Sequence, residues 1–456
     1  MSMPPRFLFR LFPLAGRTSA WVEQRFSPAG RLVVSLLVAG VLFGIDIRQT
    51  LGYQIAALNF ALLITSLIFS ARWKPGISLL RILPQHVTAT IPTSYWLEIT
   101  NHGSRPERDL IVHDRLPNPR ISFDDYRRAL VFGAGAGATT NWFDHAVGFT
   151  RWVEMRRNLR GAEVDAQRVP AIPPATTIRI KVPLTVRRRG WVHFDTVHLL
   201  RPDPLGLFRA RYTIKDKAEL LSLPRRYATP RIKLRSERRY QKGGISLAMA
   251  VGDSQEFASL RDYQPGDPRR HIHWRSFAKT GKLIVKQYQD EYFDRHALVI
   301  DTHLVHSRPA LFEAVISVGA SIAGGEKPRD SILDVIFAGS EVVQLSVGRG
   351  LGDALQALAY LADIQPCDDA DINQLAELLR ERAGQFASVI LVLGRMDAAR
   401  EALINDLAQH GVPSVKLYVT EEDSAEPGAA DTTQHDVFRI RCEHIAEDLA
   451  RVEMKS

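Results

Sequence analysis

The chain has 456 residues, 45% of them hydrophobic and 24% charged, a composition typical of folded protein and a length sufficient for two or three domains. Its formal net charge of +9 favours acidic partners, namely anionic lipid, an acidic protein or nucleic acid. The two cysteines, Cys367 and Cys442, exclude a disulfide framework and a zinc-type Cys/His site, and they suit a reducing compartment.

The first seventy residues are predicted to anchor the chain in a membrane. A basic segment, residues 1–31, precedes two uncharged runs, Leu32–Ile45 and Leu51–Phe69. The second run is long enough to cross about 30 Å of hydrocarbon, whereas the first needs local thinning or help from its flanks. We predict two transmembrane helices over residues 32–70; a buried hairpin of a soluble domain and a cleaved signal peptide are the alternatives.

The distribution of basic residues sets the predicted orientation. Residues 1–31 hold five arginines against one glutamate, and Arg72 and Lys74 follow the second run. The connection between the runs holds only Arg48. The positive-inside rule therefore places both termini in the cytoplasm, as in a multi-pass protein of the cell's inner (plasma) membrane.

Residues 75–224 alternate apolar and polar side chains between turn residues, as in Tyr95–Thr100 and Thr177–Leu184. This pattern predicts a β-rich module of the antiparallel sandwich type. The small-residue run Gly133–Ala138 is interpreted as a loop, because no strand, GK[ST] sequence and helix surround it. The basic segment that follows, residues 225–251, is either a solvated linker or a clamp for anionic lipid or an acidic partner.

Residues 252–290 carry an unusual density of charged, aromatic and turn residues. Ser254 is predicted to cap a short helix, and Pro265-Gly266 to form a turn. The alternation over residues 271–275 predicts a strand, and Leu283–Val285 a buried strand.

Three interpretations of this segment compete. The first is catalysis by acid/base groups, carried by Glu256, Asp262, Asp267, His271 and His273. The second is metal binding, because two histidines spaced i, i+2 share one face of a strand. The third, which we favour, is a polar network that shapes a loop; it joins Arg261, Arg270 and Arg275 to Glu256, Asp262 and Asp267.

Residues 291–456 show strand–helix alternation. All-apolar runs predict strands buried on both faces: 297–300, 389–393 and 415–419, joined by further strands at 332–337, 341–346 and 437–440. Apolar stripes predict helices: 309–323, 351–361, 372–384 and 397–410. Residues 422–435 are predicted to be an acidic insertion. Right-handed crossovers then give an α/β doubly wound sheet.

The segment at 252–290 resembles domain-of-unknown-function family 58 through a motif that reads E-F-x-x-L-R-x-Y-x-x-G-D-x-x-R-x-I-x-W and then A-K. Its carriers are Glu256, Phe257, Leu260, Arg261, Tyr263, Gly266, Asp267, Arg270, Ile272, Trp274, Ala278 and Lys279. Position 273, often acidic in the family, is His273. The bend Asp203–Phe208 resembles a second family signature, with Leu205 for the usual Phe.

The resemblance implies a von Willebrand factor A-like domain over residues 291–456. Many such domains hold a divalent ion through D-x-S-x-S at the end of the first strand. This chain has Asp301 but His303 and Val305 in place of the serines. We therefore expect a degenerate site at Asp301, with no metal and no cofactor.

The resemblance also implies partners: a MoxR-type AAA+ ATPase and, in some cases, a membrane transglutaminase-like protein. We accordingly predict a membrane-anchored scaffold or adaptor without catalytic residues, in contact with membrane lipid and not with nucleic acid. Eight residues form its predicted partner-binding or structural motif: Glu256, Arg261, Tyr263, Gly266, Asp267, Arg270, Trp274 and Lys279. The alternative is an unrecognised hydrolase that uses Asp267, His271 and His273.

Overall fold

The structure is a computed structural model of the whole chain. It describes residues 6–43, 50–132, 148–229, 255–267, 269–290, 294–303, 308–325, 331–338, 342–348, 354–366, 372–421 and 437–452. Several sequence predictions fall outside these ranges: the Gly133–Ala138 loop, Ser254, Val305, most of the basic linker and the acidic insertion.

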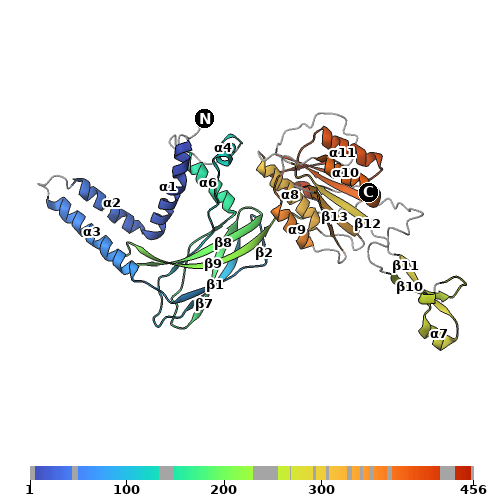
Figure 1. Cartoon of the computed structure of the whole chain (residues 1–456), viewed down its shortest axis with the longest axis horizontal. Coiled ribbons are helices and arrows are strands. Elements are labelled where there is room, and N and C mark those ends of the chain that lie inside the picture. The colour runs from blue at the N-terminus through green and yellow to red at the C-terminus, as the bar shows by residue number, and fades with distance from the viewer. Residues whose placement is uncertain are drawn as a thin grey trace. The chain divides into compact units, whose positions relative to one another are not determined.

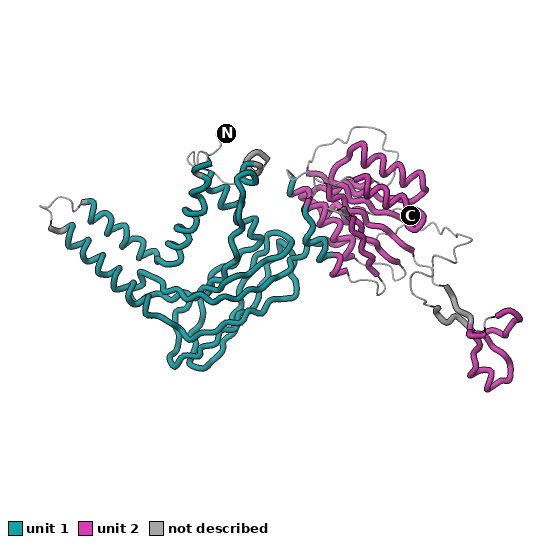
Figure 2. The backbone as a smooth tube through the Cα atoms, in the orientation of Figure 1, with its two compact units in different colours: residues 1–226, 305–309, 358–365 teal, residues 227–304, 310–357, 366–456 magenta. Residues whose placement is uncertain are grey.

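The chain divides into two compact units, shown in Figure 2. Unit 1 comprises residues 1–226, 305–309 and 358–365. Unit 2 comprises residues 227–304, 310–357 and 366–456. Each unit is described by itself.

Unit 1 begins with three helices, α1 (Arg6–Arg25), α2 (Pro28–Phe43) and α3 (Thr50–Ala71). Figure 1 shows α2 and α3 side by side, and a Cβ on Gly40 of α2 would lie 3.3 Å from the Cβ of Ala56 in α3. Most apolar side chains of this hairpin, such as Leu42 and Leu58, are exposed. A helix at α1 was not predicted.

One described helix, over Gly52–Ala71, is long and apolar enough to cross a membrane by its length and composition alone. The other predicted span, α2, has 16 residues, which is short of the ~20 that a bilayer requires. By length and composition the described residues therefore support one of the two predicted spans, α3, and the other stays a prediction.

A bend at Asp203–Phe208 joins two long strands of unit 1. The carboxylate of Asp203 accepts hydrogen bonds from the backbone N–H groups of Leu205 (3.3 Å) and Phe208 (2.9 Å). Leu207 and Phe208 of this bend are buried, whereas Leu205 is exposed.

The same bend seats the start of α2. The Ser27 hydroxyl donates to the carbonyl oxygen of Gly206 at 2.5 Å and accepts from the N–H of Gly30 at 2.9 Å, which caps the helix. A Cβ on Gly30 would lie only 2.0 Å from the carbonyl oxygen of Leu207. Glycine at position 30 thus allows the hairpin to sit directly on the β-rich module.

The β-rich module has two sheets around one hydrophobic core. The first has the order β1-β3-β7-β5: β1 (Ile77–Ile82), β3 (Thr93–Asn101), β7 (Thr177–Val186) and β5 (Ala162–Val164). The second has the order β2-β9-β8-β4-β6: β2 (His86–Thr88), β9 (Arg209–Leu223), β8 (Gly190–Pro202), β4 (Ile111–Arg115) and β6 (Gln167–Arg168). All pairs are antiparallel except β2 with β9.

Two helices that were not predicted lie between β4 and β5 in the chain: α4 (Phe123–Phe132) and α6 (Phe149–Arg160). Trp152 of α6 and Tyr126 of α4 form a small aromatic core with Phe12 of α1. The N-terminal helix is therefore packed on the β-rich module as part of the same folded unit.

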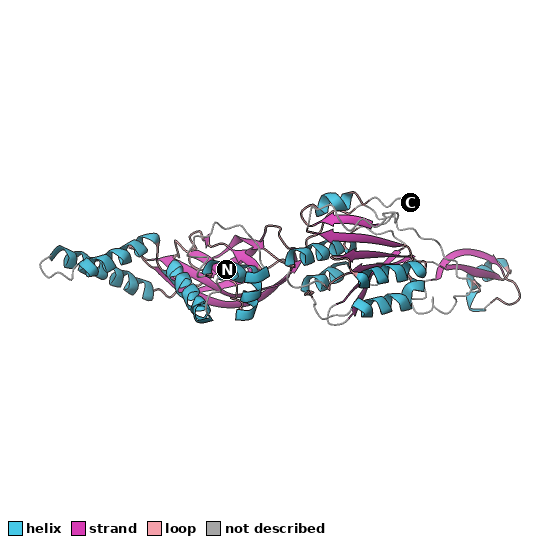
Figure 3. Ribbon diagram, turned by 90° about the horizontal axis from the view of Figure 1, so that it is seen from above, coloured by secondary structure: helices cyan, strands magenta, loops and turns pink. Residues whose placement is uncertain are grey.

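Unit 2 contains a six-stranded sheet of order β14-β13-β12-β15-β16-β17, whose strands lie side by side in Figures 1 and 3. Its strands are β12 (Asp294–Ile300), β13 (Ser331–Ala338), β14 (Val342–Val347), β15 (Ser388–Leu393), β16 (Ser414–Thr420) and β17 (Val437–Arg441). All pairs are parallel except β13 with β14. The chain moves outward from β12 to one edge and then crosses back to β15, which places a topological switch point between β12 and β15.

Helices pack on both faces of this sheet. They are α8 (Pro309–Ala323), α10 (Ile372–Arg382), α11 (Ala398–Gln409) and α12 (Ile445–Ala450). Helix α9 (Ala354–Asp363) precedes α10 in the chain, and its residues from 358 onward belong to unit 1. Val299 shares a core with α10 and α11, whereas a Cβ on Gly319 of α8 would meet the side chain of Ile300 at 2.4 Å. Because neighbouring residues of a strand face opposite sides, α8 covers the face opposite to α10 and α11.

Candidate functional site

The motif segment forms a two-stranded antiparallel hairpin, β10 (Gln255–Asp262) with β11 (Ile284–Asp290). The prediction of a short helix after Ser254 is therefore wrong. The spacing of Phe257 and Leu260 fits one face of a helix, but β11 supplies a hydrogen-bonding edge that sequence spacing cannot reveal.

The tip of the hairpin carries a short 3-10 turn, Arg269–His271, and helix α7 (Trp274–Thr280). The strand predicted over residues 271–275 is therefore wrong. The backbone N–H of His273 bonds to the Ile284 carbonyl at 2.8 Å, and α7 then ends at Gly281 in the left-handed conformation. Five residues of alternation were too few to distinguish a strand from a turn followed by a helix.

A salt bridge fixes the loop before α7. Two nitrogens of Arg261 donate to the two carboxylate oxygens of Asp267 at 2.7 and 2.6 Å, and the backbone N–H of Gln264 donates to the same carboxylate at 2.9 Å. Hydrogen bonds from Arg261 and then Gln264 lower the pKa of Asp267. Gly266 lies inside this loop with φ of 110°, a conformation that favours glycine. Of the predicted polar network the structure shows the pair of Arg261 and Asp267, whereas the Nε of Arg270 donates to the Nε2 of His271 at 3.3 Å.

Helix α7 presents an aromatic pair to solvent. The rings of Trp274 and Phe277 meet edge to face with centroids 6.1 Å apart, and Trp274 is 60% exposed. Basic residues of α7 and of the segments directly before and after it are also exposed: Arg269, Arg270, Arg275, Lys279 and Lys282. We call these seven residues the aromatic–basic face.

The histidines do not share the face of a strand, so the basis of the metal interpretation is wrong. His271 ends the 3-10 turn and His273 precedes α7. The Nδ1 atom of His273 instead lies 2.6 Å from the Ser276 hydroxyl. Among the described residues, no group of three or more His, Cys, Asp or Glu could hold a metal ion.

The remaining motif residues lie along the same hairpin. Glu256 pairs with Gln289 in the strand ladder, and the backbone N–H of Tyr263 bonds to the carbonyl of Leu283. Arg270 and Lys279 are exposed. All eight predicted residues therefore belong to β10, the loop after it and α7.

Asp301 occupies a second polar site, in unit 2. It follows β12 directly, and its N–H bonds to the Val392 carbonyl of β15, so it lies at the switch point of the sheet. Two nitrogens of Arg400 donate to its two carboxylate oxygens at 2.8 and 2.9 Å. Both side chains are 1% exposed. The guanidinium of Arg400 therefore occupies both carboxylate oxygens of Asp301, which a divalent ion would need as ligands.

Further contacts fix Arg400 in this place. Its third nitrogen donates to Asp397 at 2.6 Å, and Asp397 also caps the N-terminus of α11. Burial alone would raise the pKa of Asp301, but the neighbouring groups of His303 and Arg400, together with the charge of Arg400, lower it below its ordinary value. The sequence analysis missed Arg400, which lies 99 residues from Asp301; its i, i+3 spacing from Asp397 was the only local signal.

Comparisons with known proteins agree with the family resemblance for the C-terminal region. The family described as "Protein of unknown function DUF58" matches residues 259–437, which include most of the motif hairpin and the sheet up to β17. An uncharacterised protein of Bacillus subtilis (strain 168), YeaD, is 26% identical over 251 residues. That alignment covers 53% of this chain and 59% of YeaD.

Similarity to solved structures is too low to support an assignment of the fold. A mutant of Salmonella alpha-2-macroglobulin is similar over 34% of this chain and 8% of its own, with 10% identity and a TM-score of 0.18. A PapD-like domain of human CEP192 is similar over 33% of this chain and 89% of its own, with 11% identity and a TM-score of 0.17. The von Willebrand factor A assignment stays a prediction.

Proposed function

We propose that this protein is a membrane-anchored adaptor that binds a partner protein through the aromatic–basic face of its motif hairpin. The observation that carries the proposal is Trp274, a large aromatic side chain held 60% exposed on α7. Exposed Trp surrounded by basic residues is typical of interface anchors, because Trp and Arg are enriched at binding hot spots.

The charge of this face defines the chemistry of the partner. Five exposed basic residues lie within eight positions of Trp274 in the chain, and Asp267 is already bonded to Arg261. A complementary surface therefore offers an apolar pocket for Trp274 with carboxylates at its rim. By family resemblance the partner is a MoxR-type AAA+ ATPase, with a membrane transglutaminase-like protein as a further candidate.

The remaining parts of the chain support an adaptor. The hairpin of α2 and α3 would anchor it, because most of its apolar side chains are exposed and α3 is long enough to span a bilayer. The sheet of unit 2 would act as a metal-independent von Willebrand factor A-like domain, because Arg400 supplies the positive charge beside Asp301. In this arrangement the protein recruits its partner to the cytoplasmic face of the inner membrane.

The proposal is tested by binding between the detergent-solubilised full chain and the purified MoxR-type AAA+ ATPase of the same organism. Trp274→Ala should weaken binding by about tenfold or more, as expected for a central aromatic anchor. Trp191→Ala removes another exposed indole, on β8 of unit 1, and should bind as wild type. Equal binding by Trp274→Ala and wild type, or no binding of the ATPase at all, would overturn the proposal.

The contact between His273 and Ser276 favours a second candidate, a hydrolase. A histidine nitrogen 2.6 Å from a serine hydroxyl is the geometry of a base and its nucleophile. The two residues are only three positions apart at the start of α7, however, where a local cap has the same geometry. A fluorophosphonate probe decides: labelling of wild type that disappears in Ser276→Ala supports the hydrolase, and absence of labelling supports the adaptor.

A further inference from the structure

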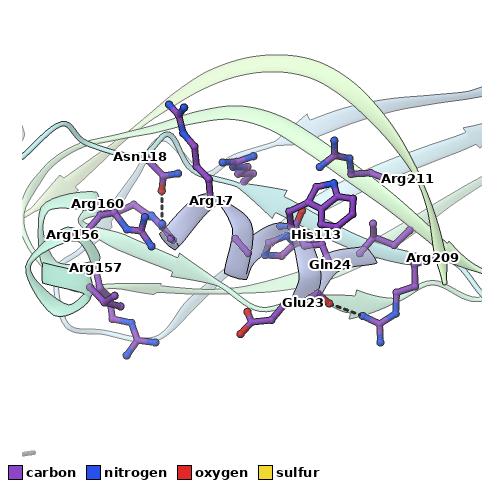
Figure 4. Close-up of a pocket in the computed structure, with 17 residues that line it drawn as sticks. Arg17, Glu23, Gln24, His113, Asn118, Arg156, Arg157, Arg160, Arg209 and Arg211 are labelled. Atoms are coloured by element: carbon purple, nitrogen blue, oxygen red, sulfur yellow. Dashed lines mark hydrogen bonds between the residues drawn. The ribbon is translucent and has the colours of Figure 1, made fainter. Parts of the chain in front are cut away.

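A cavity of about 690 Å³ lies in unit 1, between helices α1 and α6 and the second sheet. It is independent of the motif hairpin. Arg17 of α1 lines it, together with Arg156, Arg157 and Arg160 of α6. Three more arginines reach it from strands β4 and β9: Arg115, Arg209 and Arg211. Figure 4 shows Arg156 and Arg160 on one side of the cavity and Arg209 and Arg211 on the other.

Little negative charge faces these arginines. Of the residues that line the cavity, Glu23 is the one acidic residue, and it is exposed. Arg157 pairs with Glu163, which lies outside the lining, and Arg160 donates to the amide oxygen of Asn118. Within the described residues, no carboxylate forms a salt bridge with Arg17, Arg115, Arg156 or Arg211. Like charges held this close repel one another unless an anion lies between them.

One buried donor beside the cavity lacks a partner: the Nε of Arg160 has no hydrogen-bond acceptor among the described residues. Burial, then the nearby arginines, lowers the pKa of Arg156 and of Arg160, which indicates that their charges are poorly compensated. Buried polar groups in folded proteins almost always have a partner, so the unpaired Nε is a further sign that the arginines of α6 lack compensating negative charge.

We propose that this arginine pocket binds a phosphate ester that carries at least two negative charges. Guanidinium groups recognise phosphate oxygens through paired N–H donors, and several of them on opposite walls suit an anion with more than one charged oxygen. The lining also includes Trp21, Val153 and Leu200, which would contact an apolar part of the ligand. Trp21 lies in the last turns of α1, a few residues before the hairpin of α2 and α3 starts. The ligand is therefore either the headgroup of an anionic lipid or a soluble phosphate compound.

The test is a titration of the full chain in neutral detergent with two probes, followed by thermal unfolding. Inorganic pyrophosphate represents the soluble source, and dihexanoyl phosphatidic acid represents the lipid headgroup. Dihexanoyl phosphatidylcholine is the control with no net charge. At least one anionic probe should raise the unfolding temperature saturably, and the probe that binds more tightly identifies the source.

Substitutions of single arginines test whether the anionic probe binds in this pocket. Arg160→Gln and Arg211→Gln should each weaken binding by about tenfold, because each removes charged donors from the pocket. Arg17→Gln, whose side chain is exposed, serves as a variant that should fold normally and still bind more weakly. Arg179→Gln makes the same change of charge on β7, outside the pocket, and should bind as wild type. Absence of saturable binding, or equal weakening by Arg179→Gln, would overturn the proposal.

Discussion

Two arginine–aspartate pairs of this protein have the same geometry and opposite surroundings. Arg400 and Asp301 form a bidentate pair in which both side chains are 1% exposed. Arg261 and Asp267 form a bidentate pair on the motif hairpin, where the arginine side chain is 38% exposed. The first lies at the switch point of a sheet, and the second shapes a loop beside an exposed helix.

The comparison separates the stability of the fold from the shape of a binding surface. Water solvates each charge of the exposed pair when the pair opens, so the net stabilisation is small. Water cannot reach the buried pair, so loss of one partner leaves an unpaired charge in the interior. We therefore expect substitutions at Arg400 to act on the free energy of unfolding, and substitutions at Arg261 to act on binding.

The largest expected effect is that of Arg400→Met. Removal of the guanidinium leaves Asp301 charged and buried, which should lower the free energy of unfolding of unit 2 by about 3–5 kcal/mol. The measurement is urea-dependent pulse proteolysis of the full chain in detergent, read by mass spectrometry on peptides of β12. Arg380→Met is the matched control, because its pair with Asp406 on neighbouring helices is exposed; it should cost about 1 kcal/mol or less.

A double variant distinguishes an unpaired charge from lost packing. Asp301→Leu combined with Arg400→Met removes both charges, so it should recover most of the stability that Arg400→Met loses. If the double variant is as unstable as Arg400→Met alone, the electrostatic account of this pair is wrong.

A smaller effect is the pH dependence of the buried pair. The pKa of Asp301 is lowered in the folded state, so the pair contributes fully above the unfolded-state value of about 3.9. Its contribution should be lost as the pH falls below about 4 toward the folded-state pKa. We therefore expect wild type to exceed the double variant in free energy of unfolding by a constant amount near neutral pH. This difference should decline in acid. A difference that rises in acid would contradict this sign.

The smallest effect on stability is expected for Arg261→Ala. Because the pair is exposed, the free energy of unfolding should change by about 1 kcal/mol or less. Backbone hydrogen exchange should nevertheless increase at Gln264 and Asp267, whose N–H groups hydrogen-bond within the loop. Arg261→Lys should fail to restore protection, because an ammonium cannot make the bidentate contact. Unchanged exchange in Arg261→Ala would show that the pair does not hold the loop.

The sequence predicted the elements of the six-stranded sheet of unit 2 and of the helices on it well, because their signals are local. The run Val389–Leu393 lies within β15, and every residue of β15 is buried, as an all-apolar strand requires. The spacing of Ile372, Leu375 and Leu379 matches the buried face of α10. In both cases the side-chain pattern within a few residues determined the element.

Features that depend on distant residues were not predictable. The strand β10 requires β11, and the charge partner of Asp301 comes from a helix in a later crossover. The arginine pocket combines residues from Arg17 to Arg211, whereas we interpreted the N-terminal arginines as a signal for membrane orientation alone. The sequence thus indicated some of the polar residues that form these features, but not which of them contact one another in the folded chain.

The central claim, that the aromatic–basic face binds a partner protein, is tested most directly by photo-crosslinking in the native membrane. A photoreactive amino acid is placed at position 274 and, as a control, at position 191, which also holds an exposed tryptophan. The account predicts a crosslink to the MoxR-type AAA+ ATPase from position 274 and none from position 191. No protein crosslink from position 274, or the same crosslinks from both positions, would contradict it.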